Sequence, residues 1–574
     1  MTIMVDYGQQ PSRGTRGLSL LVDYVTDSHL RAVALLMFVA LVAFLPGFFQ
    51  VPPVDRDEAR FAQATKQMIE SGDYVDIRYQ DESRYKKPVG IYWMQAGVVK
   101  AAEALGVPEA RTTIWLYRLP SLVGGVGAVL LTYWTALAFV SRRAAVLAGL
   151  LFAGTILLGV EARLAKTDAM LLLTVIASMG ALGRVYLGSR GAYGEPFHGW
   201  RLAAIFWTAI AGGILLKGPL ILMFVALTLG ALAAFDRSLR WLKELKPAAG
   251  IVWTLLLVLP WFVAIIQRSG MSFFIESIGE DLIAKVASGQ ESHGAPPGFY
   301  FALFWFTFWP GAPLALLAAP AVWRAWREPG ARFLLAWLVP SWIVFEVVIT
   351  KLPHYVLPLY PPIAILAAGV VNHHALSRNR WLVRGTVGWF IIAALMAIAM
   401  IVGMIAVGGE LGLLAWPFAA VATIFGLLAW WLFEADGPER ALLRAVTASI
   451  LIGIAAYGVT FPTLTNLFPS AAIAEYLKSP GCDEPRVAAA GFHEPSLVFL
   501  VGTRTVLTEG TGAADFLRQG GCRFAVIENR QERSFVRRAD AIGLRYAPAT
   551  RIEGINISGG RPVSIAIYRS EGAP

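Results

Sequence analysis

Charged and aromatic side chains recur in short motifs that lie between long apolar segments of this 574-residue chain. The motifs are DRDEAR at 55–60, SGD at 71–73, YKKPVGIYW at 85–93, RLAKTDA at 163–169, LKGP at 216–219 and KLPHYVLPLYP at 351–361. Ionised groups beside apolar sequence are costly unless they have a partner or a function. Together the motifs predict a functional site, although any single residue could instead anchor the end of a helix.

Two kinds of chemistry fit these residue types. Lysine and arginine neutralise the negative charge of a departing phosphate, and a carboxylate within hydrogen-bond reach removes the proton of an acceptor hydroxyl. Asp55 is the candidate for that base. If the acceptor is itself a phosphate, no proton need be removed, and Asp55 would orient a substrate while Asp168 organises the lysines or holds the first loop. The phosphate candidates are Lys87, Lys217 and Lys351, supported by Arg60 and Arg163.

The composition indicates a membrane protein. Hydrophobic residues make up 56% of the chain and charged residues 15%, with a mean hydropathy of +0.59, whereas soluble domains average about 25% charged residues. Apolar stretches of the roughly 20 residues that cross a bilayer recur from about residue 30 to about residue 462. We predict about thirteen spans, at 30–49, 119–140, 145–160, 168–187, 201–216, 219–235, 249–267, 298–320, 333–350, 356–371, 385–407, 411–433 and 445–462.

The distribution of basic residues predicts the orientation. If the N-terminal segment 1–29 is cytoplasmic, every cytoplasmic loop is basic, as the positive-inside rule requires, and the motifs share the periplasmic side. This pattern also explains the net charge of +10 without nucleic acid as a partner. Segment 1–29 has no apolar run before a small-residue cleavage site, so a removed signal peptide is not expected. The loop residues are Arg142, Arg143, Arg184, Arg190, Arg201, Arg237, Arg240, Lys243, Lys246, Arg324, Arg327, Arg332, Arg378, Arg380, Arg384, Arg440 and Arg444.

The first periplasmic loop, residues 50–118, is long enough to hold structure of its own. Asp57 and Glu58 begin a stretch with helical apolar spacing that ends before Gly72, so an interfacial helix is expected there. Acidic residues in a first turn also favour the helix dipole, which is the structural alternative to a catalytic role. A second amphipathic helix is expected at about 88–105, lying at the interface without spanning.

After about residue 470 the chain changes to short alternating runs. The runs at 486–491, 496–501, 524–527 and 563–568 are predicted strands, and 513–518 and 536–541 are predicted helices. A periplasmic α/β domain of about 100 residues is therefore expected at 470–574. Both cysteines of the chain, Cys482 and Cys522, fall inside it. In an oxidising compartment they would form a disulfide, and two buried free thiols are the alternative.

The motif set resembles the bacterial GT-C glycosyltransferases of the aminoarabinose (lipid A) transferase and protein O-mannosyltransferase-like group, up to about residue 371. The resemblance implies a polytopic α-helical membrane protein with about thirteen transmembrane helices, interfacial helices in the first periplasmic loop and a C-terminal periplasmic α/β domain. The transmembrane domain would cover residues 30–469. It also implies a polyprenyl-phosphate sugar as donor.

Site residues follow from the resemblance motif by motif. The acidic motif of the first loop corresponds to Asp55, or to Asp57 and Glu58, and the second acidic motif corresponds to Asp168. The EKPP-like element falls on Lys86, Lys87 and Pro88, with Lys86 where a glutamate is usual and Val89 in place of the second proline. The substitution at Lys86 leaves a divalent metal open, with His293 as the candidate ligand. Further substrate-binding candidates are Tyr92, Arg163, Lys166, Lys217, Lys351, His354 and Tyr355.

The predicted function is transfer of a sugar from a polyprenyl-phosphate donor to a lipid A, surface-glycan or protein acceptor at the periplasmic face of a bacterial inner membrane. No cofactor is required by this prediction. A transporter, flippase or polymerase for lipid-linked sugars is the alternative, because it would also hold charges near a lipid phosphate. Paired repeats with broken helices at the bilayer midplane would favour a transporter, and the charges here lie instead at one edge.

Overall fold

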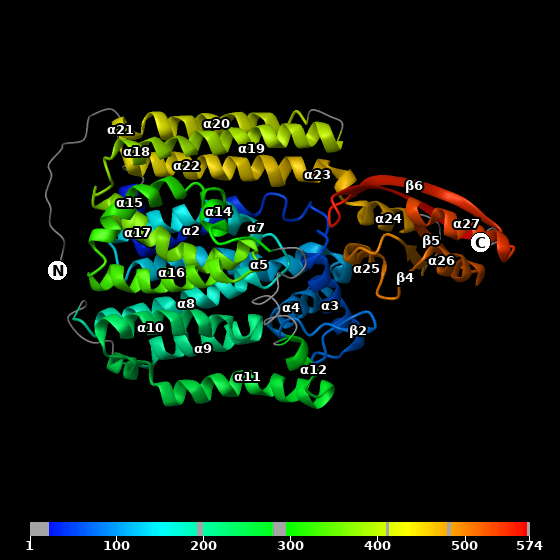
Figure 1. The fold of residues 1–574 in the computed structure, drawn as a ribbon, viewed down its shortest axis with the longest axis horizontal. Helices are drawn as coiled ribbons and strands as arrows, with labels where there is room; N and C mark the ends of the chain where they lie inside the picture. The colour runs from blue at the N-terminus through cyan, green and yellow to red at the C-terminus, as the bar shows by residue number, and fades with distance from the viewer. Residues whose placement is uncertain are drawn as a thin grey trace.

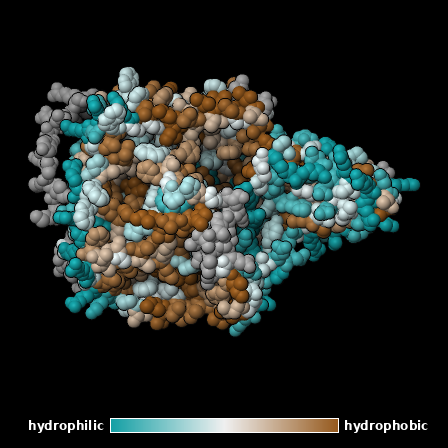
Figure 2. Space-filling model, viewed as in Figure 1, coloured by the Kyte–Doolittle hydropathy of each residue, from teal (hydrophilic) through white to brown (hydrophobic). Residues whose placement is uncertain are grey.

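The computed structural model describes residues 22–191, 199–277, 279, 294–408, 412–478 and 484–570. A layer of long helices forms one part of the molecule, and a smaller mixed domain projects from one end of it (Figure 1). The long helices expose a broad apolar surface, whereas the small domain and the opposite end of the layer are mainly hydrophilic (Figure 2). An apolar band between two polar ends is the surface that a bilayer requires.

The helical layer places its backbone hydrogen bonds inside each helix, as lipid requires. Its main helices are α2 (His29–Phe44), α5 (Ile114–Ala136), α6 (Arg142–Ala153), α7 (Ile156–Glu161), α8 (Asp168–Gly188), α9 (Trp200–Lys217), α10 (Leu220–Asp236), α11 (Pro247–Ser269), α14 (Phe299–Thr307), α15 (Ala312–Arg324), α16 (Pro329–Val347), α17 (Tyr360–Asn372), α19 (Gly388–Gly403), α20 (Ala415–Trp431) and α22 (Pro438–Gly453). Shorter pieces are η2 (Arg240–Leu245), α12 (Ser272–Phe274), η5 (Pro353–Leu359), α18 (Arg380–Arg384), η6 (Gly385–Val387), η7 (Met404–Gly408), α21 (Phe433–Asp436), η8 (Ile454–Thr460), α23 (Phe461–Thr463) and η9 (Thr465–Leu467).

Eight helices in the described part of the chain are long and apolar enough to cross a membrane, or nine if the bent pair α14 and α15 is one span. Helices α2, α10 and α20 are apolar but shorter. Each of the thirteen predicted apolar segments is occupied by helix, so a multi-span helical membrane protein is confirmed and the number of spans stays a prediction. Helix α8 lies at the centre, with 78% of its apolar window buried, whereas the window that contains α19 is 22% buried and faces outward.

The first loop folds as the sequence predicted. Helix α3 (Asp57–Ser71) begins with Asp57 and Glu58 in its first turn and ends at Gly72, which has φ +70°. A hairpin of β1 (Arg78–Tyr79) and β2 (Glu82–Ser83) leads to α4 (Gly90–Ala104), and η1 (Ala110–Thr112) precedes α5. The loop helices lie at the same end of the helical layer as the C-terminal domain (Figure 1).

The C-terminal domain is a five-stranded sheet with the order β4-β3-β5-β7-β6, covered by helices. Strand β3 pairs in parallel with β4 and β5, and β7 pairs antiparallel with β5 and β6. The elements are α24 (Pro469–Lys478), β3 (Arg486–Ala490), α25 (Pro495–Val501), β4 (Val506–Thr508), α26 (Gly510–Arg518), β5 (Arg523–Glu528), α27 (Asn529–Ala541), β6 (Tyr546–Asn556) and β7 (Arg561–Ser570).

One predicted strand of this domain is wrong. Residues 496–501 form α25 instead, with Pro495 at the first helical position, where proline is favoured. A short apolar run cannot be assigned by periodicity alone, and here Leu497, Val498 and Phe499 are all buried by packing of the helix. Cys522 is disulfide-bonded, while Cys482 lies outside the described residues, so the pairing of the two stays a prediction.

Candidate active site

Five charged or titratable side chains from three parts of the chain meet at the end of the helical layer that faces the C-terminal domain. We call Glu161, Lys166, Asp168, Lys217 and His354 the charged cluster. Lys217 Nζ lies 2.5 Å from Asp168 Oδ1, and Lys166 Nζ lies 2.9 Å from Glu161 Oε1 and 3.8 Å from Asp168 Oδ2. His354 Nε2 lies 3.7 Å from Asp168 Oδ1, and its Nδ1 lies 4.0 Å from Glu161 Oε1.

Helix ends deliver these groups to one place. Asp168 is the first residue of α8 and Lys217 is the last residue of α9, and each charge has the sign that its helix terminus favours. Glu161 ends α7, and η5 presents His354 after the turn at Pro353. All five side chains are at most 11% exposed, so their charges are stable only as pairs. The negative charges of the two carboxylates balance the positive charges of the two ammonium groups.

The same cluster contains the grouping most suited to a metal in the described part of the chain. One atom each from Glu161, Asp168 and His354 lie within 4.8 Å of one another. Lys166 binds Glu161 Oε1 and Lys217 binds Asp168 Oδ1, whereas Glu161 Oε2 has no hydrogen-bond partner among the described residues. A divalent ion would add two positive charges to a buried set that is already neutral, so the residues present do not fit a metal. His293, the sequence candidate for a ligand, lies outside the described residues.

Two charged residues of the first loop interact with the charges of the cluster. The ammonium group of Lys166 interacts with the carboxylate of Asp57, which lies on the exposed start of α3. His354 interacts with Lys87, which is half-buried, whereas the neighbouring Lys86 is exposed. Lys217 lies 5.4 Å from the centre of the Tyr355 ring. Asp57, Lys87 and Tyr355 therefore lie near the cluster, and their roles stay predictions.

Two sequence candidates are placed elsewhere. Lys351 Nζ donates to the backbone oxygens of Phe345 at 2.8 Å, Glu346 at 2.7 Å and Val348. All three donors of the ammonium group are thus engaged at the end of α16, which corrects its assignment to phosphate. Tyr92 is fully buried and packs against Phe61 at a ring distance of 5.4 Å, so it belongs to the core of the first loop rather than to a sugar-stacking surface.

Glu58 forms a saturated clamp beneath the first loop. Its two oxygens accept from Arg118 Nε and Nη2, each at 2.8 Å, and from the backbone N–H groups of Val54 and Ala165, each at 2.9 Å. Arg118 also donates to backbone oxygens of residues 48, 51 and 52. Glu58 therefore ties the first loop to the segment that carries Lys166, and these contacts argue for positioning rather than proton transfer.

Asp55 lies three residues before this clamp, where the first loop meets the C-terminal domain. Its Oδ1 accepts from the backbone N–H of Ser496 at 3.0 Å. Burial raises the pKa of Asp55 to about 6; the hydrogen bonds from Ser496 and the charge of Arg60 oppose this shift, and the charge of Glu494 adds to it. A carboxylate with such a pKa is suited to accept a proton near neutral pH.

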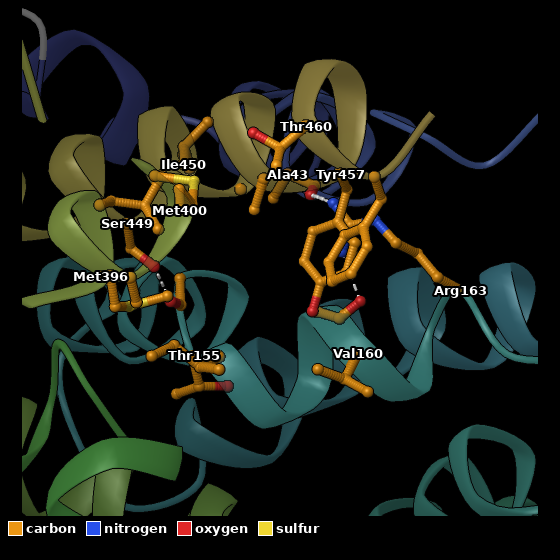
Figure 3. A pocket seen from close by; sticks show the side chains of 18 of the residues that line it. Ala43, Thr155, Val160, Arg163, Met396, Met400, Ser449, Ile450, Tyr457 and Thr460 are labelled. Carbon is orange, nitrogen blue, oxygen red and sulfur yellow. Dashed lines mark hydrogen bonds between the residues drawn. The ribbon is translucent and has the colours of Figure 1, made fainter. Parts of the chain in front are cut away.

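An apolar pocket of about 580 Å³ lies beside α7 (Figure 3). Its walls come from the end of α2 and from α7, α14, α19, α22 and η8. Arg163 lies at one end beside Tyr457, with its guanidinium 4.3 Å from the ring centre, and donates to backbone oxygens of Pro46, Gly159 and Ala43. Helix α7 therefore contributes residues to both the apolar pocket and the charged cluster.

Sequence reasoning missed three residues of this region. Glu161 was not assigned because it ends an apolar segment and belongs to no motif, yet its Oε2 is buried with no hydrogen-bond partner in the described structure. Arg118 lies at the start of an apolar helix, where an isolated basic residue looks like an anchor. Ser496 lies 441 residues from Asp55, and no local pattern could have paired them.

Residues 86–263 match the family model of dolichyl-phosphate-mannose-protein mannosyltransferases. The undecaprenyl phosphate-alpha-4-amino-4-deoxy-L-arabinose arabinosyl transferase of Erwinia tasmaniensis is 27% identical over 56% of this chain and 55% of its own length. The enzyme of that name from Yersinia pestis is 28% identical over 59% of this chain and 58% of its own length. The chain thus spans a little over half the length of these curated relatives.

Solved structures match over nearly the whole chain. The crystal structure of ArnT from Cupriavidus metallidurans bound to undecaprenyl phosphate has a TM-score of 0.70 at 20% identity, covering 94% of this chain and 98% of that one. The apo oligosaccharyltransferase of Archaeoglobus fulgidus has a TM-score of 0.50 at 13% identity, covering 90% and 69%. The resemblance to the aminoarabinose transferase and mannosyltransferase-like group is confirmed, and so is a helical membrane fold of GT-C type.

Proposed function

We propose that this chain is an integral-membrane glycosyltransferase that moves a sugar from a polyprenyl-phosphate donor to a glycolipid of the lipid A type. The observation that carries this proposal is the charged cluster, where Lys166 and Lys217 are buried against Asp168 at one edge of the helical layer. Relatives named as arabinosyl transferases of undecaprenyl phosphate-aminoarabinose, and the relative crystallised with undecaprenyl phosphate, support this choice of donor.

The cluster suits the departure of a lipid phosphate. In the transfer, the bond between the sugar C1 and the phosphate oxygen breaks, the phosphate leaves with the electron pair, and C1 bonds to the acceptor oxygen. Fixed positive charge near that leaving oxygen stabilises the transition state, and it acts more strongly in a buried site than in water. Lys217 supplies this charge, with Lys166 and the nearby Lys87 in support, and Asp168 holds the two cluster lysines in place before the donor binds.

Asp55 acts on the acceptor. A hydroxyl acceptor loses its proton to a nearby carboxylate as the new bond forms, and the raised pKa of Asp55 suits that task. Glu58 links the two halves of the site, because it bonds to the first loop at Val54 and to the 162–167 segment at Ala165. A phosphate acceptor would already be ionised, and Asp55 would then orient it.

The apolar pocket beside α7 receives the lipid chain of a substrate. It lies within the apolar helical layer, next to the helix whose last residue is Glu161, and its lining is almost wholly aliphatic and aromatic (Figure 3). Ala399→Trp fills this pocket and is expected to raise KM for a lipid-linked substrate. Ala397→Trp, on the same helix but outside the pocket lining, is the matched control and should leave KM unchanged. Equal KM values for the two variants would exclude this pocket as the binding site of the lipid chain.

The location that fits this function is a bacterial inner membrane, with about thirteen spans. The N-terminus and the basic loops would face the cytoplasm, and the first loop and residues 470–574 the periplasm. Reporter fusions after Arg143, Lys246 and Arg444 should report cytoplasm, and a fusion after Ser470 should report periplasm. The opposite pattern would separate the site from its substrates.

The function is tested with the purified full chain in lipid vesicles. Vesicles containing undecaprenyl-phosphate aminoarabinose and lipid A should yield lipid A with the added mass of one aminosugar, detected by mass spectrometry. Lys217→Met should abolish this product, whereas Lys100→Met, at an exposed position of α4, should not. Movement of the donor across the bilayer without any sugar transfer would overturn the proposal in favour of a transporter.

A further inference from the structure

The C-terminal domain contacts the first loop through α25. Lys66 of α3 is buried and donates from Nζ to the backbone oxygen of Phe499 at 2.8 Å, while Gln63 Nε2 donates to Thr503 Oγ1 at 2.8 Å. The ring of Phe499 packs edge-on against Tyr117 at 5.2 Å. This interface buries a lysine and two aromatic rings, so α25 is packed as core rather than resting on the loop.

The start of α25 lies against the candidate base. Ser496 is in the first turn of the helix, whose N–H groups have no acceptor within the helix, and its N–H donates to Asp55 Oδ1 at 3.0 Å. The Ser496 hydroxyl donates to Ser470 Oγ at 2.6 Å, which links α25 to α24. Ser496 is thus held by two contacts, one with Ser470 of its own domain and one with Asp55 of the first loop.

Glu494 adds a negative charge beside the same carboxylate. Its two oxygens accept from Asn556 Nδ2 at 2.7 Å and from Ser558 Oγ at 2.8 Å, both near the turn between β6 and β7. Arg56, next to Asp55 in sequence, donates to the backbone oxygen of Ser558 at 2.6 Å. The first loop and this turn therefore hold Glu494 and Asp55 together, from opposite sides.

We propose that the C-terminal domain completes the active site, with Ser496 as a positioning residue that fixes the Asp55 carboxylate for reaction and Glu494 as the neighbouring charge that tunes it. This inference rests on the proposed function and deepens it. The domain would act from more than 400 residues away in sequence, and its docking would determine how the acceptor meets the base.

The charges that face Asp55 give the proposal a signature that a purely structural role lacks. Glu494 raises the pKa of Asp55, whereas Ser496 and Arg60 lower it, and Tyr79 lies close enough to feel the charges of both carboxylates. Removing the Ser496 N–H, which donates to Asp55 Oδ1, should therefore move the acid limb of the transfer rate to higher pH. Removing the charge of Glu494 should move the same limb to lower pH.

The experiment measures kcat and KM for sugar transfer across pH 5 to 8 with the full chain in vesicles. Ser496→Pro removes the backbone N–H of this residue at a first-turn position that tolerates proline, so it should lower kcat with KM for the donor unchanged and shift the acid limb upward. Ser496→Ala keeps the N–H and should retain the wild-type kcat. Glu494→Gln should shift the limb downward. Ser534→Ala, a serine of α27 in the same domain, is the matched control and should leave the wild-type profile.

The outcomes separate this proposal from the proposed function. Wild-type transfer with unchanged kcat and pH profile in Ser496→Pro and Glu494→Gln, each shown to be folded by thermal unfolding, would overturn the role of the domain alone. A wild type without transfer activity would overturn the proposed function. If the wild-type rate is flat with pH but Ser496→Pro still loses kcat, Ser496 positions Asp55 as an orienting group.

Discussion

Glu58 and Asp168 are carboxylates at the same end of the helical layer, and both are almost fully buried. Glu58 accepts hydrogen bonds from Arg118 and two backbone N–H groups, all fixed by the fold. Asp168 instead faces the ammonium groups of Lys166 and Lys217, which end flexible chains and can turn toward another anion. The two carboxylates are buried alike, so burial alone does not separate a structural carboxylate from a catalytic one; we expect the partners of each carboxylate to do so.

Breaking the Glu58 clamp should produce the largest effect on stability. Arg118→Met leaves Glu58 as a buried charge without its cation, and removal of one partner of a buried pair costs about 3–5 kcal/mol. Thermal unfolding in detergent measures the loss. Arg111→Met is the control, because its ion pair with Glu103 is exposed and such pairs contribute about 0–1 kcal/mol. Equal losses in both variants would contradict the structural role of the clamp.

Neutralising Asp168 should affect turnover more than folding. In Asp168→Asn, Glu161 still pairs with Lys166, but Lys217 loses its carboxylate partner and is no longer held for the donor phosphate. Transfer should fall about 10²-fold, the effect of losing one organised electrostatic contact. A rate assay beside thermal unfolding separates the two effects. A normal rate in a destabilised protein would place Asp168 with Glu58 as a structural residue.

Titration of Asp55 distinguishes it from both other carboxylates. Burial raises its pKa to about 6, and only the ionised form accepts a proton, so transfer should be complete above this pH and be lost as the pH falls through it. The initial rate between pH 5 and 8 provides the measurement, and Asp57→Asn, at an exposed position, should keep the same limb. An initial transfer rate that stays unchanged down to pH 5 would exclude Asp55 as the base.

The smallest functional effect is expected at Lys351. Its three hydrogen bonds to backbone oxygens come from a charged ammonium group, and such bonds contribute about 1.5–3 kcal/mol each, so Lys351→Met should lower stability while KM for the donor stays unchanged. Titration of the initial rate with donor concentration tests this. A large rise in KM for the donor would show that Lys351 binds the donor phosphate.

The sequence predicted the parts of this fold that depend on periodicity and charge. Each apolar segment became helix, and α3 begins at Asp57 and ends before Gly72 as its acidic first turn and glycine indicated. Residues 496–501 were assigned to a strand because a short apolar run has the same composition in either state. These residues instead form a helix that packs against α3 and Tyr117. No local sequence pattern contains those contacts.

The site was predicted as a set of residue types but not as a set of contacts. Motif spacing identified Lys217 and Asp168, which the structure brings to 2.5 Å. It could not show that Lys351 turns back to the end of the preceding helix, α16, because that depends on three backbone carbonyl groups rather than on side chains. Nor could it find Ser496, whose only signal is contact with Asp55 across the whole chain.

The most direct measurement is the rate of sugar transfer from undecaprenyl-phosphate aminoarabinose to lipid A by wild type and Asp55→Asn in the same vesicles. We predict transfer by the wild type and a loss of at least about 10²-fold in the variant, the usual contribution of a general base, with an unchanged unfolding temperature. Transfer at the wild-type rate by Asp55→Asn would contradict a site built around this carboxylate.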